Sequence, residues 1–390
     1  MNMESIISLD QEYVAGTYGR FPVELVSGKG SRVTDTAGKE YIDMGSGIGV
    51  TSFGFGDEAW VTAVTAQLGS LQHTSNLYYT EPCAVLAQLL CEKTGMKKVF
   101  FSNSGAEANE CAIKVARKYS AEKKGPEYST IITLVNSFHG RTLTTLAATG
   151  QDKFHELFQP LTPGFIPTPA NNIDALAKAV AEGKIAGIMM ECVQGEGGVL
   201  PLKAEFVQAA AKLAKENDIP LIIDEVQTGN GRSGKLYSYM NFGIEPDIVS
   251  TAKGLGGGLP IGACMMGEKV RNVLGPGDHG STYGGNPVCC AGAYSIISRI
   301  DDKLLAEVRE KSAYVFSAFE NAPGVESVAG MGLMVGIKTV KPAKEVVMKC
   351  IENGVLCLTA KDKVRLLPAL NIPMEDLRKA VEVIKAACKE

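Results

Sequence analysis

The sequence predicts an α/β protein with a large domain, in which helices flank a mostly parallel sheet, and a smaller α+β domain. Short apolar segments alternate with helical segments from about residue 60 to Pro287, which is typical of a parallel sheet covered on both faces. After Pro287 this alternation ends, and the pattern predicts a smaller α+β arrangement. A chain of 390 residues is also too long for one ordinary core, so we expect at least two domains.

The first 55 residues favour short strands and turns, with a hairpin at 33–43 that turns at Gly38. Spacing of apolar residues predicts helices over 106–119 and 204–216. Buried strands are predicted where a short apolar run is bounded by turn residues, at 98–102, 130–135, 185–192, 220–226, 247–251 and 261–266.

Beyond Pro287 we expect a long helix over about 288–320 and then a smaller α+β arrangement. Its further elements are a strand at 333–337, a helix at 343–352, strands at 355–358 and 364–367, and a last helix from Met374. The predicted domains are therefore a large domain at 56–287 and a small domain made of 288–390 together with residues 1–55.

Composition excludes several classes of function. A net charge of −4 and a pI of about 5.8 give no basic surface for nucleic acid, and no apolar run approaches the ~20 residues of a membrane span. No signal peptide is expected at the N-terminus. The ten cysteines form no CxxC pair and most lie in apolar segments, which favours reduced core cysteines in a cytoplasmic protein. Neither they nor the four histidines match a metal-binding motif.

Two predicted strands end at residues that can bind a ligand or take part in catalysis. One reaches Asp224, and another is followed by Lys253 and a glycine-rich loop at 254–258. In a parallel sheet, ligands bind beyond the carboxyl ends of the strands. Asp224 is therefore either a ligand contact or a loop cap. Lys253 is either a solvated loop residue or, where desolvated, a nucleophile toward carbonyl groups.

Two further strands are followed by turns suited to an anion and to a planar ring. At Ser104-Gly105-Ala106 the chain passes through small residues into a helix, which points free N–H groups and the positive end of the helix dipole at an anion. Ser104 and Glu107 also match an ordinary capping box. Phe138 can stack on a ring and Arg141 can bind a carboxylate, unless they are a core aromatic and a surface arginine.

Together these four features match the needs of pyridoxal 5′-phosphate (PLP). The aspartate keeps the pyridine nitrogen protonated, and the lysine binds the cofactor as a Schiff base. The small-residue turn binds the phosphate, and the aromatic side chain covers the ring. The sequence therefore predicts a PLP enzyme in which Lys253 and Asp224 are the catalytic residues.

On these motifs the chain resembles the class III aminotransferases of PLP fold type I, and within that class it most resembles the acetylornithine aminotransferases. The resemblance covers essentially the whole chain. It is carried by the segments Ser75–Tyr79, Asn103–Glu110, Asn136–Thr142, Gln194–Gly198, Asp224–Gly229, Ala252–Gly258 and Gly280–Pro287.

For the cofactor, the resemblance implies that Lys253 forms the Schiff base and moves the proton of the 1,3-shift, while Asp224 pairs with the pyridine nitrogen. Gln227 approaches the ring hydroxyl, and Val226 packs on the ring face opposite Phe138. The implied cofactor-binding residues are Ser104, Gly105, Ala106, Phe138, His139, Asp224, Val226, Gln227, Lys253 and Thr282. Because Thr282 is expected to reach the phosphate from a neighbouring subunit, the resemblance also implies a homodimer with shared active sites.

For the substrates, the resemblance implies Arg141, Glu196, Arg365, Ser281 and Tyr18 as binding residues. Arg141 resembles the arginine that takes the α-carboxylate of the amino donor, and Arg365 the arginine that receives a carboxylate of 2-oxoglutarate. Glu196 resembles the acid that pairs with this second arginine. A pair that opens and closes would change the polarity of the pocket without leaving a charge buried and unpaired.

The implied activity is a ping-pong transfer of an amino group from N2-acetyl-L-ornithine to 2-oxoglutarate. The products are N-acetylglutamate 5-semialdehyde and glutamate, and the implied role is in arginine biosynthesis. Succinylornithine, ornithine and 4-aminobutyrate aminotransferases of the same class are the alternatives.

Three segments depart from the family pattern. Residues 54–58 lack the usual Gly-His-x-His-Pro, and Glu191-Cys192 replaces Glu-Pro. The segment Thr359-Ala-Lys-Asp-Lys363 stands where a Gly/Asn-rich turn is common. This last segment lies near the predicted substrate pocket and is the reason that the identity of the amino donor stays open.

Other classes of protein fit less well. Residues 229–236 fall one residue short of a P-loop, because Leu236 stands where Ser or Thr must bind Mg²⁺. The glycines at 254–258 lack the spacing of a dinucleotide-binding loop, and no helix follows before Pro260. A non-catalytic protein of the same fold would have lost Lys253 or Asp224, and both are present.

Overall fold

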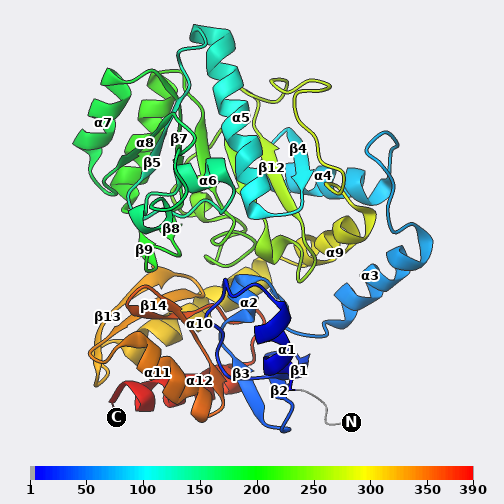
Figure 1. Cartoon of the computed structure of the whole chain (residues 1–390), viewed down its shortest axis with the longest axis vertical. Coiled ribbons are helices and arrows are strands. Elements are labelled where there is room, and N and C mark those ends of the chain that lie inside the picture. The colour runs from blue at the N-terminus through cyan, green and yellow to red at the C-terminus, as the bar shows by residue number, and fades with distance from the viewer. Residues whose placement is uncertain (1–4, 390) are drawn as a thin grey trace.

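The computed structural model describes residues 5–389 (Figure 1). Its large domain is built on a seven-stranded sheet. The strands, in order across the sheet, are β4 (Lys98–Ser102), β12 (Gly262–Met266), β11 (Ile248–Thr251), β10 (Leu221–Asp224), β7 (Ile185–Met190), β5 (Thr130–Leu134) and β6 (Phe165–Thr168). Only β12 runs antiparallel to its neighbours in this sheet, so the predicted mostly parallel sheet is confirmed.

Helices cover both faces of this sheet, as its continuously apolar strands require. Along β10, Ile222 packs in one cluster with residues of α5 (Gly105–Lys124), whereas Leu221 and Ile223 pack in another with residues of α8 (Ala204–Glu216). This alternation follows from the two-residue period of a strand. The second cluster also takes in residues from α4 (Glu81–Thr94), α7 (Ile173–Glu182) and α9 (Pro287–Ser298).

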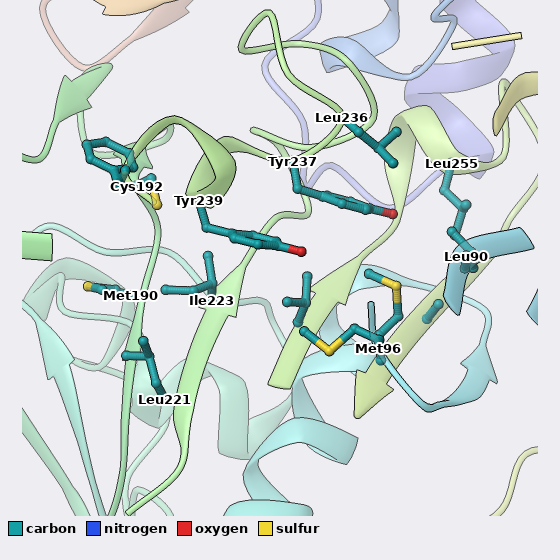
Figure 2. Close-up of a cluster of buried hydrophobic side chains, with 14 of the residues drawn as sticks. Leu90, Met96, Met190, Cys192, Leu221, Ile223, Leu236, Tyr237, Tyr239 and Leu255 are labelled. Atoms are coloured by element: carbon teal, nitrogen blue, oxygen red, sulfur yellow. The ribbon is translucent and has the colours of Figure 1, made fainter. Parts of the chain in front are cut away.

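The larger of these clusters contains two buried tyrosines that follow β10 along the chain. Figure 2 shows the rings of Tyr237 and Tyr239 lying side by side above Ile223, and their centroids are 6.2 Å apart with nearly parallel planes. Leu255, which lies two residues after Lys253, is fully buried in the same cluster. The packed core therefore anchors the segment that follows β10 and the turn that follows Lys253.

The small domain contains two four-stranded sheets, visible in the lower half of Figure 1. The first has the order β1 (Leu25–Lys29), β2 (Arg32–Asp35), β3 (Glu40–Asp43) and β15 (Val355–Leu356). The second has the order β13 (Val325–Met331), β14 (Met334–Thr339), β17 (Lys363–Leu366) and β16 (Leu358–Ala360). Because β15 pairs with β3, the N- and C-terminal parts of the chain form one α+β unit, as expected.

Helices α10 (Asp302–Phe319), α11 (Ala343–Glu352) and α12 (Met374–Lys389) complete the small domain. The remaining helices and strands are α1 (Ile6–Tyr13), α2 (Ser46–Gly49), α3 (Glu58–Ser70), α6 (Leu143–Ala148), β8 (Val193–Gln194) and β9 (Leu200–Pro201). Within the described residues, no helix combines the length and apolar character needed to cross a membrane.

Several elements differ from the prediction. The expected strand at 355–358 is divided between β15 and β16, which lie in different sheets. The expected single helix over 288–320 is wrong, because the chain breaks after α9 and restarts at Asp301, whose carboxylate caps α10 by accepting a hydrogen bond from the Leu304 N–H at 2.8 Å. The strands β6 and β13 were not predicted. Helix α9 packs on α3 and α4 in the core of the large domain. The domain boundaries at 55/56 and 287/288 stay predictions.

Candidate active site

A cavity of about 630 Å³ opens beyond the carboxyl ends of the parallel strands. Segments that directly follow β4, β5, β7, β10 and β11 supply most of its wall. The sequence-predicted residues that line it are Tyr18, Ser104, Gly105, Ala106, Phe138, His139, Arg141, Asp224, Val226, Gln227 and Lys253. The strand ends therefore bring together most of the predicted site, as the parallel sheet requires.

Asp224 is the last residue of β10 and is only 3% exposed. Its Oδ1 accepts a hydrogen bond from the Val226 N–H at 2.9 Å, and its Oδ2 accepts from Asn109 Nδ2 and from His139 Nδ1, each at 2.8 Å. A buried carboxylate is tolerated only with such partners. Asn109 also donates to the His139 carbonyl at 2.8 Å. The hydrogen bond from Val226 shows the loop-cap role of Asp224, and its predicted contact with a ligand stays a prediction.

His139 lies buried next to Asp224. Burial by itself lowers the pKa of His139, but the hydrogen bond and negative charge of Asp224, with the charge of Glu191, outweigh burial and raise that pKa above its usual value. Its other ring nitrogen, Nε2, is buried and has no hydrogen-bond partner within residues 5–389. The imidazole is therefore held against Asp224 by the hydrogen bond between its Nδ1 and Asp224 Oδ2.

Lys253 follows β11 and begins a single 3₁₀ turn that ends at Leu255. Its backbone has φ +46°, a left-handed conformation that costs a non-glycine residue roughly 1–2 kcal/mol and is concentrated at functional sites. Burial is the main cause that lowers the pKa of its ammonium group, and the charge of Arg365 lowers it further. In the described part of the chain no group hydrogen-bonds its Nζ, which leaves the amine free to react.

The turn between β4 and α5 caps the helix as predicted and leaves room for the predicted anion. Ser104 caps the helix: its Oγ accepts from the Glu107 N–H at 3.2 Å and donates to Glu107 Oε2 at 3.0 Å. This capping box leaves the N–H groups of Gly105 and Ala106, which lie in the first turn, without helical partners, so they can bind an anion in the cavity. A side chain at Gly105 would approach Val226 Cγ1 to 2.6 Å, so this position requires glycine.

Phe138 is positioned by a carboxyl group that the sequence interpretation did not assign a role. Glu191, at the end of β7, accepts hydrogen bonds from the Phe138 N–H at 2.9 Å and from the Gly195 N–H at 3.2 Å. Burial raises the pKa of Glu191 to about 7, although the positive charge of His139 opposes that shift. Glu191 thus ties the loop of Phe138 to the loop that carries Glu196.

Glu196 and Arg365 form an ion pair at 2.5 Å between the large and the small domain. Gln227 joins them: its Nε2 donates to Glu196 Oε1 at 3.2 Å, and its Oε1 accepts from Arg365 Nη1 at 3.1 Å. Burial raises the pKa of Glu196, but the charges of Arg365 and Lys253 outweigh burial and leave that pKa below its usual value. Arg365 is 3% exposed and its Nε has no partner among the described residues, so one hydrogen-bond donor is unused.

The structure of one chain does not bring Thr282 into the main cavity. Thr282 and Ser281 line a separate shallow pocket together with residues 75–77. Ser281 is nevertheless linked to the cavity wall, because its Oγ accepts a hydrogen bond from Asn103 Nδ2 at 3.2 Å. The roles predicted for both residues stay predictions.

The residues of the cavity fit PLP. Asp224 offers a buried carboxylate for the pyridine nitrogen, the first turn of α5 offers free N–H groups for the phosphate, and Lys253 offers an amine with no other partner. Phe138 and Val226 present apolar surface for the two ring faces. PLP, when bound, withdraws electrons from the substrate carbon that loses a proton.

Comparisons with known proteins show the family of the chain. A family model described as aminotransferase class-III matches residues 13–388. An acetylornithine aminotransferase of Haemophilus ducreyi is 50% identical over the full length of both chains, and one of Methanocaldococcus jannaschii is 44% identical over 97% of this chain and 96% of that protein.

Solved structures show the same fold. An ornithine aminotransferase from Toxoplasma gondii superposes with a TM-score of 0.95 at 31% identity, over 99% of this chain and 96% of that one. An N-acetylornithine aminotransferase from Stenotrophomonas maltophilia has a TM-score of 0.85 at 34% identity, over 98% of both chains. The chain belongs to the class III aminotransferase family.

Proposed function

We propose that this aminotransferase uses PLP to transfer an amino group from N2-acetyl-L-ornithine to 2-oxoglutarate in a ping-pong cycle, as a step of arginine biosynthesis. The observation that carries the proposal is the arrangement of charges around Lys253: Arg141 lines the same cavity, and the Glu196–Arg365 pair lies beside Gln227, which also lines it. The full-length similarity to acetylornithine aminotransferases supports the choice of donor.

In the proposed cycle each residue has a defined task. Lys253 Nζ, with its lowered pKa, takes the proton from the substrate carbon and returns it to the cofactor side. Arg141 holds the α-carboxylate of the donor. Glu196 neutralises Arg365 while the donor is bound, and releases it when the second carboxylate of 2-oxoglutarate enters. Tyr18 lines the cavity and contacts the bound substrate.

The donor is tested by following the absorbance change of the bound cofactor with N2-acetylornithine, ornithine or 4-aminobutyrate alone. We expect the largest kcat/KM with N2-acetylornithine. We expect a loss of about 100-fold or more with 4-aminobutyrate, which has no α-carboxylate for Arg141, because a lost charge-assisted contact costs roughly 3 kcal/mol. A preference for 4-aminobutyrate would refute the role of Arg141, and a preference for ornithine would replace the proposed donor.

We also propose that the chain works as a homodimer in which Thr282 completes the phosphate site of the partner. Large apolar side chains are exposed beside the pocket of Thr282: Leu77, Tyr78, Tyr79 and Tyr283. An apolar patch of this kind marks a protein interface. A cytoplasmic location is proposed from the ten free cysteines, of which seven are buried.

Light scattering on the purified protein is expected to give about twice the chain mass of 41.3 kDa. Replacing Thr282 by valine is expected to weaken PLP binding by about tenfold, the loss of one hydrogen bond to a charged group, without changing that mass. Serine at the same position keeps the hydroxyl and serves as the control. A monomeric wild type, or a valine variant with unchanged PLP affinity, would contradict this arrangement.

A further inference from the structure

The motif at 229–236, which falls one residue short of a P-loop, lies in the loop that follows β10 and joins the two domains. We name residues 225–237 the interdomain loop. Arg232 of this loop is 2% exposed, and its Nη1 donates hydrogen bonds to the carbonyl of Leu333, at 3.2 Å, and to that of Pro368. The Arg232 carbonyl in turn accepts from the Leu333 N–H at 2.9 Å. One residue of the large domain is therefore bound to two segments of the small domain.

Both of these segments belong to the strand pair that carries Arg365. Leu333 directly precedes β14, and Pro368 follows the end of β17. The two strands are antiparallel, with Gly336 opposite Arg365, so the start of β14 and the end of β17 lie at the same end of the pair. Arg232 thus binds both strands at the end of the pair that Leu333 and Pro368 mark.

The interdomain loop also contacts the side chain of Arg365. Gln227, earlier in this loop, accepts a hydrogen bond from Arg365 Nη1 at 3.1 Å. The loop therefore binds the strand of Arg365 at two points, the guanidinium through Gln227 and the backbone beyond it through Arg232. A glycine permits this close approach, because a side chain at Gly332, which has φ +59°, would come within 2.2 Å of the Arg232 carbonyl.

The burial of Arg232 makes these contacts costly to break. Burial lowers the pKa of Arg232 to about 10, and the negative charge of Asp43 opposes that shift. Asp43, at the end of β3, is itself buried and accepts hydrogen bonds from the N–H groups of Gly45 and Ser46 at 2.8 and 3.0 Å. A buried charge that loses its hydrogen bonds is strongly destabilising, so a placement of the small domain without the Arg232 contacts is disfavoured.

We propose that Arg232 is a positioning residue for the second substrate, because it holds the strand pair so that Arg365 can bind either Glu196 or an incoming dicarboxylate. This inference rests on the proposed function, in which Arg365 receives a carboxylate of 2-oxoglutarate. Arg232 does not line the cavity, so it acts through Arg365 and not by touching the substrate. The amino donor is held by Arg141 on another loop, so the loss of Arg232 affects the dicarboxylate more than the donor.

The test uses the holoenzyme of the wild type and of three variants. Arg232→Met removes the hydrogen-bond donor, whereas Gly332→Ala keeps it and pushes the start of β14 away from the Arg232 carbonyl, so this second variant carries the test if the first does not fold. The control is Arg117→Met on α5, because Arg117 also donates to backbone carbonyls, those of Ser129 and Pro163 at 2.9 and 2.8 Å, but within the large domain.

Three quantities are measured for each protein. The first two are kcat and KM, taken separately for the half-reaction with N2-acetylornithine and for that with 2-oxoglutarate. The third is the Kd of succinate, a dicarboxylate without a reactive carbonyl group, measured by calorimetry. Circular dichroism and the melting temperature report whether each variant is folded.

Arg232→Met and Gly332→Ala are each expected to raise the KM for 2-oxoglutarate and the Kd of succinate about tenfold, as when one hydrogen bond to a charged group is lost. The kcat values and the N2-acetylornithine half-reaction are expected to stay within about threefold, and so are all constants of Arg117→Met, whose lost contacts lie away from Arg365. Equal losses in both half-reactions, or unchanged succinate binding in a folded variant, overturn the proposal.

Arg365→Ala, measured in the same way, distinguishes the two levels of the argument. If Arg365→Ala weakens succinate binding and Arg232→Met does not, the positioning role of Arg232 is wrong and the proposed function stands. If neither variant weakens succinate binding, the proposed role of Arg365 as the dicarboxylate contact is wrong as well.

Discussion

Replacing Lys253 by alanine is expected to abolish the yellow colour of the covalently held cofactor and to lower the transamination rate by at least about 10⁴-fold. The reason is that one amine has two tasks, the covalent bond to PLP and the transfer of the proton. No other lysine lines the cavity within the described chain, so no neighbour can replace it. Absorbance spectra with and without N2-acetylornithine, together with single-turnover rates, measure both losses.

The controls separate chemistry from folding. Alanine at position 253 removes a buried amine, which is costly to desolvate, and keeps the left-handed backbone that lysine has there. We therefore expect the variant to keep its fold. An unchanged mass and circular dichroism spectrum check this. Lys253→Arg keeps the positive charge near Glu196 but does not form the same bond, so it is expected to lose the colour as well. A yellow Lys253→Ala protein that still turns over would refute the assignment of Lys253.

The chemistry at the strand ends could be predicted from the sequence for a general reason. An apolar strand that ends in a single polar residue places that residue at the edge of the sheet, whatever the rest of the fold is. Asp224 and Lys253 were therefore found before any contact was known, and the cavity brings them together. The small-residue turn at 104–106 was found in the same way, although its capping box is equally real.

Contacts between distant segments could not be predicted in this way. Nothing in the residues around Asn109 or Glu191 indicates that one will donate to Asp224 and the other will accept from the Phe138 N–H. Such pairs depend on how whole strands and helices are placed. The antiparallel direction of β12 is invisible for the same reason, since an apolar run looks alike in either direction.

Two of the differences between prediction and structure have identifiable reasons. The strand β6 contains Pro167 and was missed, because proline argues against a strand unless the strand lies at the edge of a sheet, where β6 is found. The break between α9 and α10 was missed because apolar spacing continues through residues 296–305, while Asp301 starts a new helix by capping it. Capping by a single side chain can outweigh a continuous pattern.

The Glu196–Arg365 pair gives the second large effect. Since Glu196 and Gln227 both bind Arg365, the guanidinium is held beside Gln227, which lines the cavity, and among the described residues its Nε has no partner. In the proposed cycle a neutral acetamido donor leaves this pair closed, and a dicarboxylate opens it. The two half-reactions should therefore respond differently to the loss of Arg365.

Replacing Arg365 by alanine is expected to slow the half-reaction with 2-oxoglutarate by about 10²–10³-fold, because the incoming carboxylate loses its partner and meets an unpaired Glu196, a cost of roughly 3–4 kcal/mol. The half-reaction with N2-acetylornithine is expected to fall by less than about tenfold. Adding Glu196→Ala to the alanine variant removes the repelling carboxylate, so the double variant should recover part of the 2-oxoglutarate rate. This non-additivity measures the coupling of the pair, and equal losses in both half-reactions without recovery would show that the pair does not distinguish the two substrates.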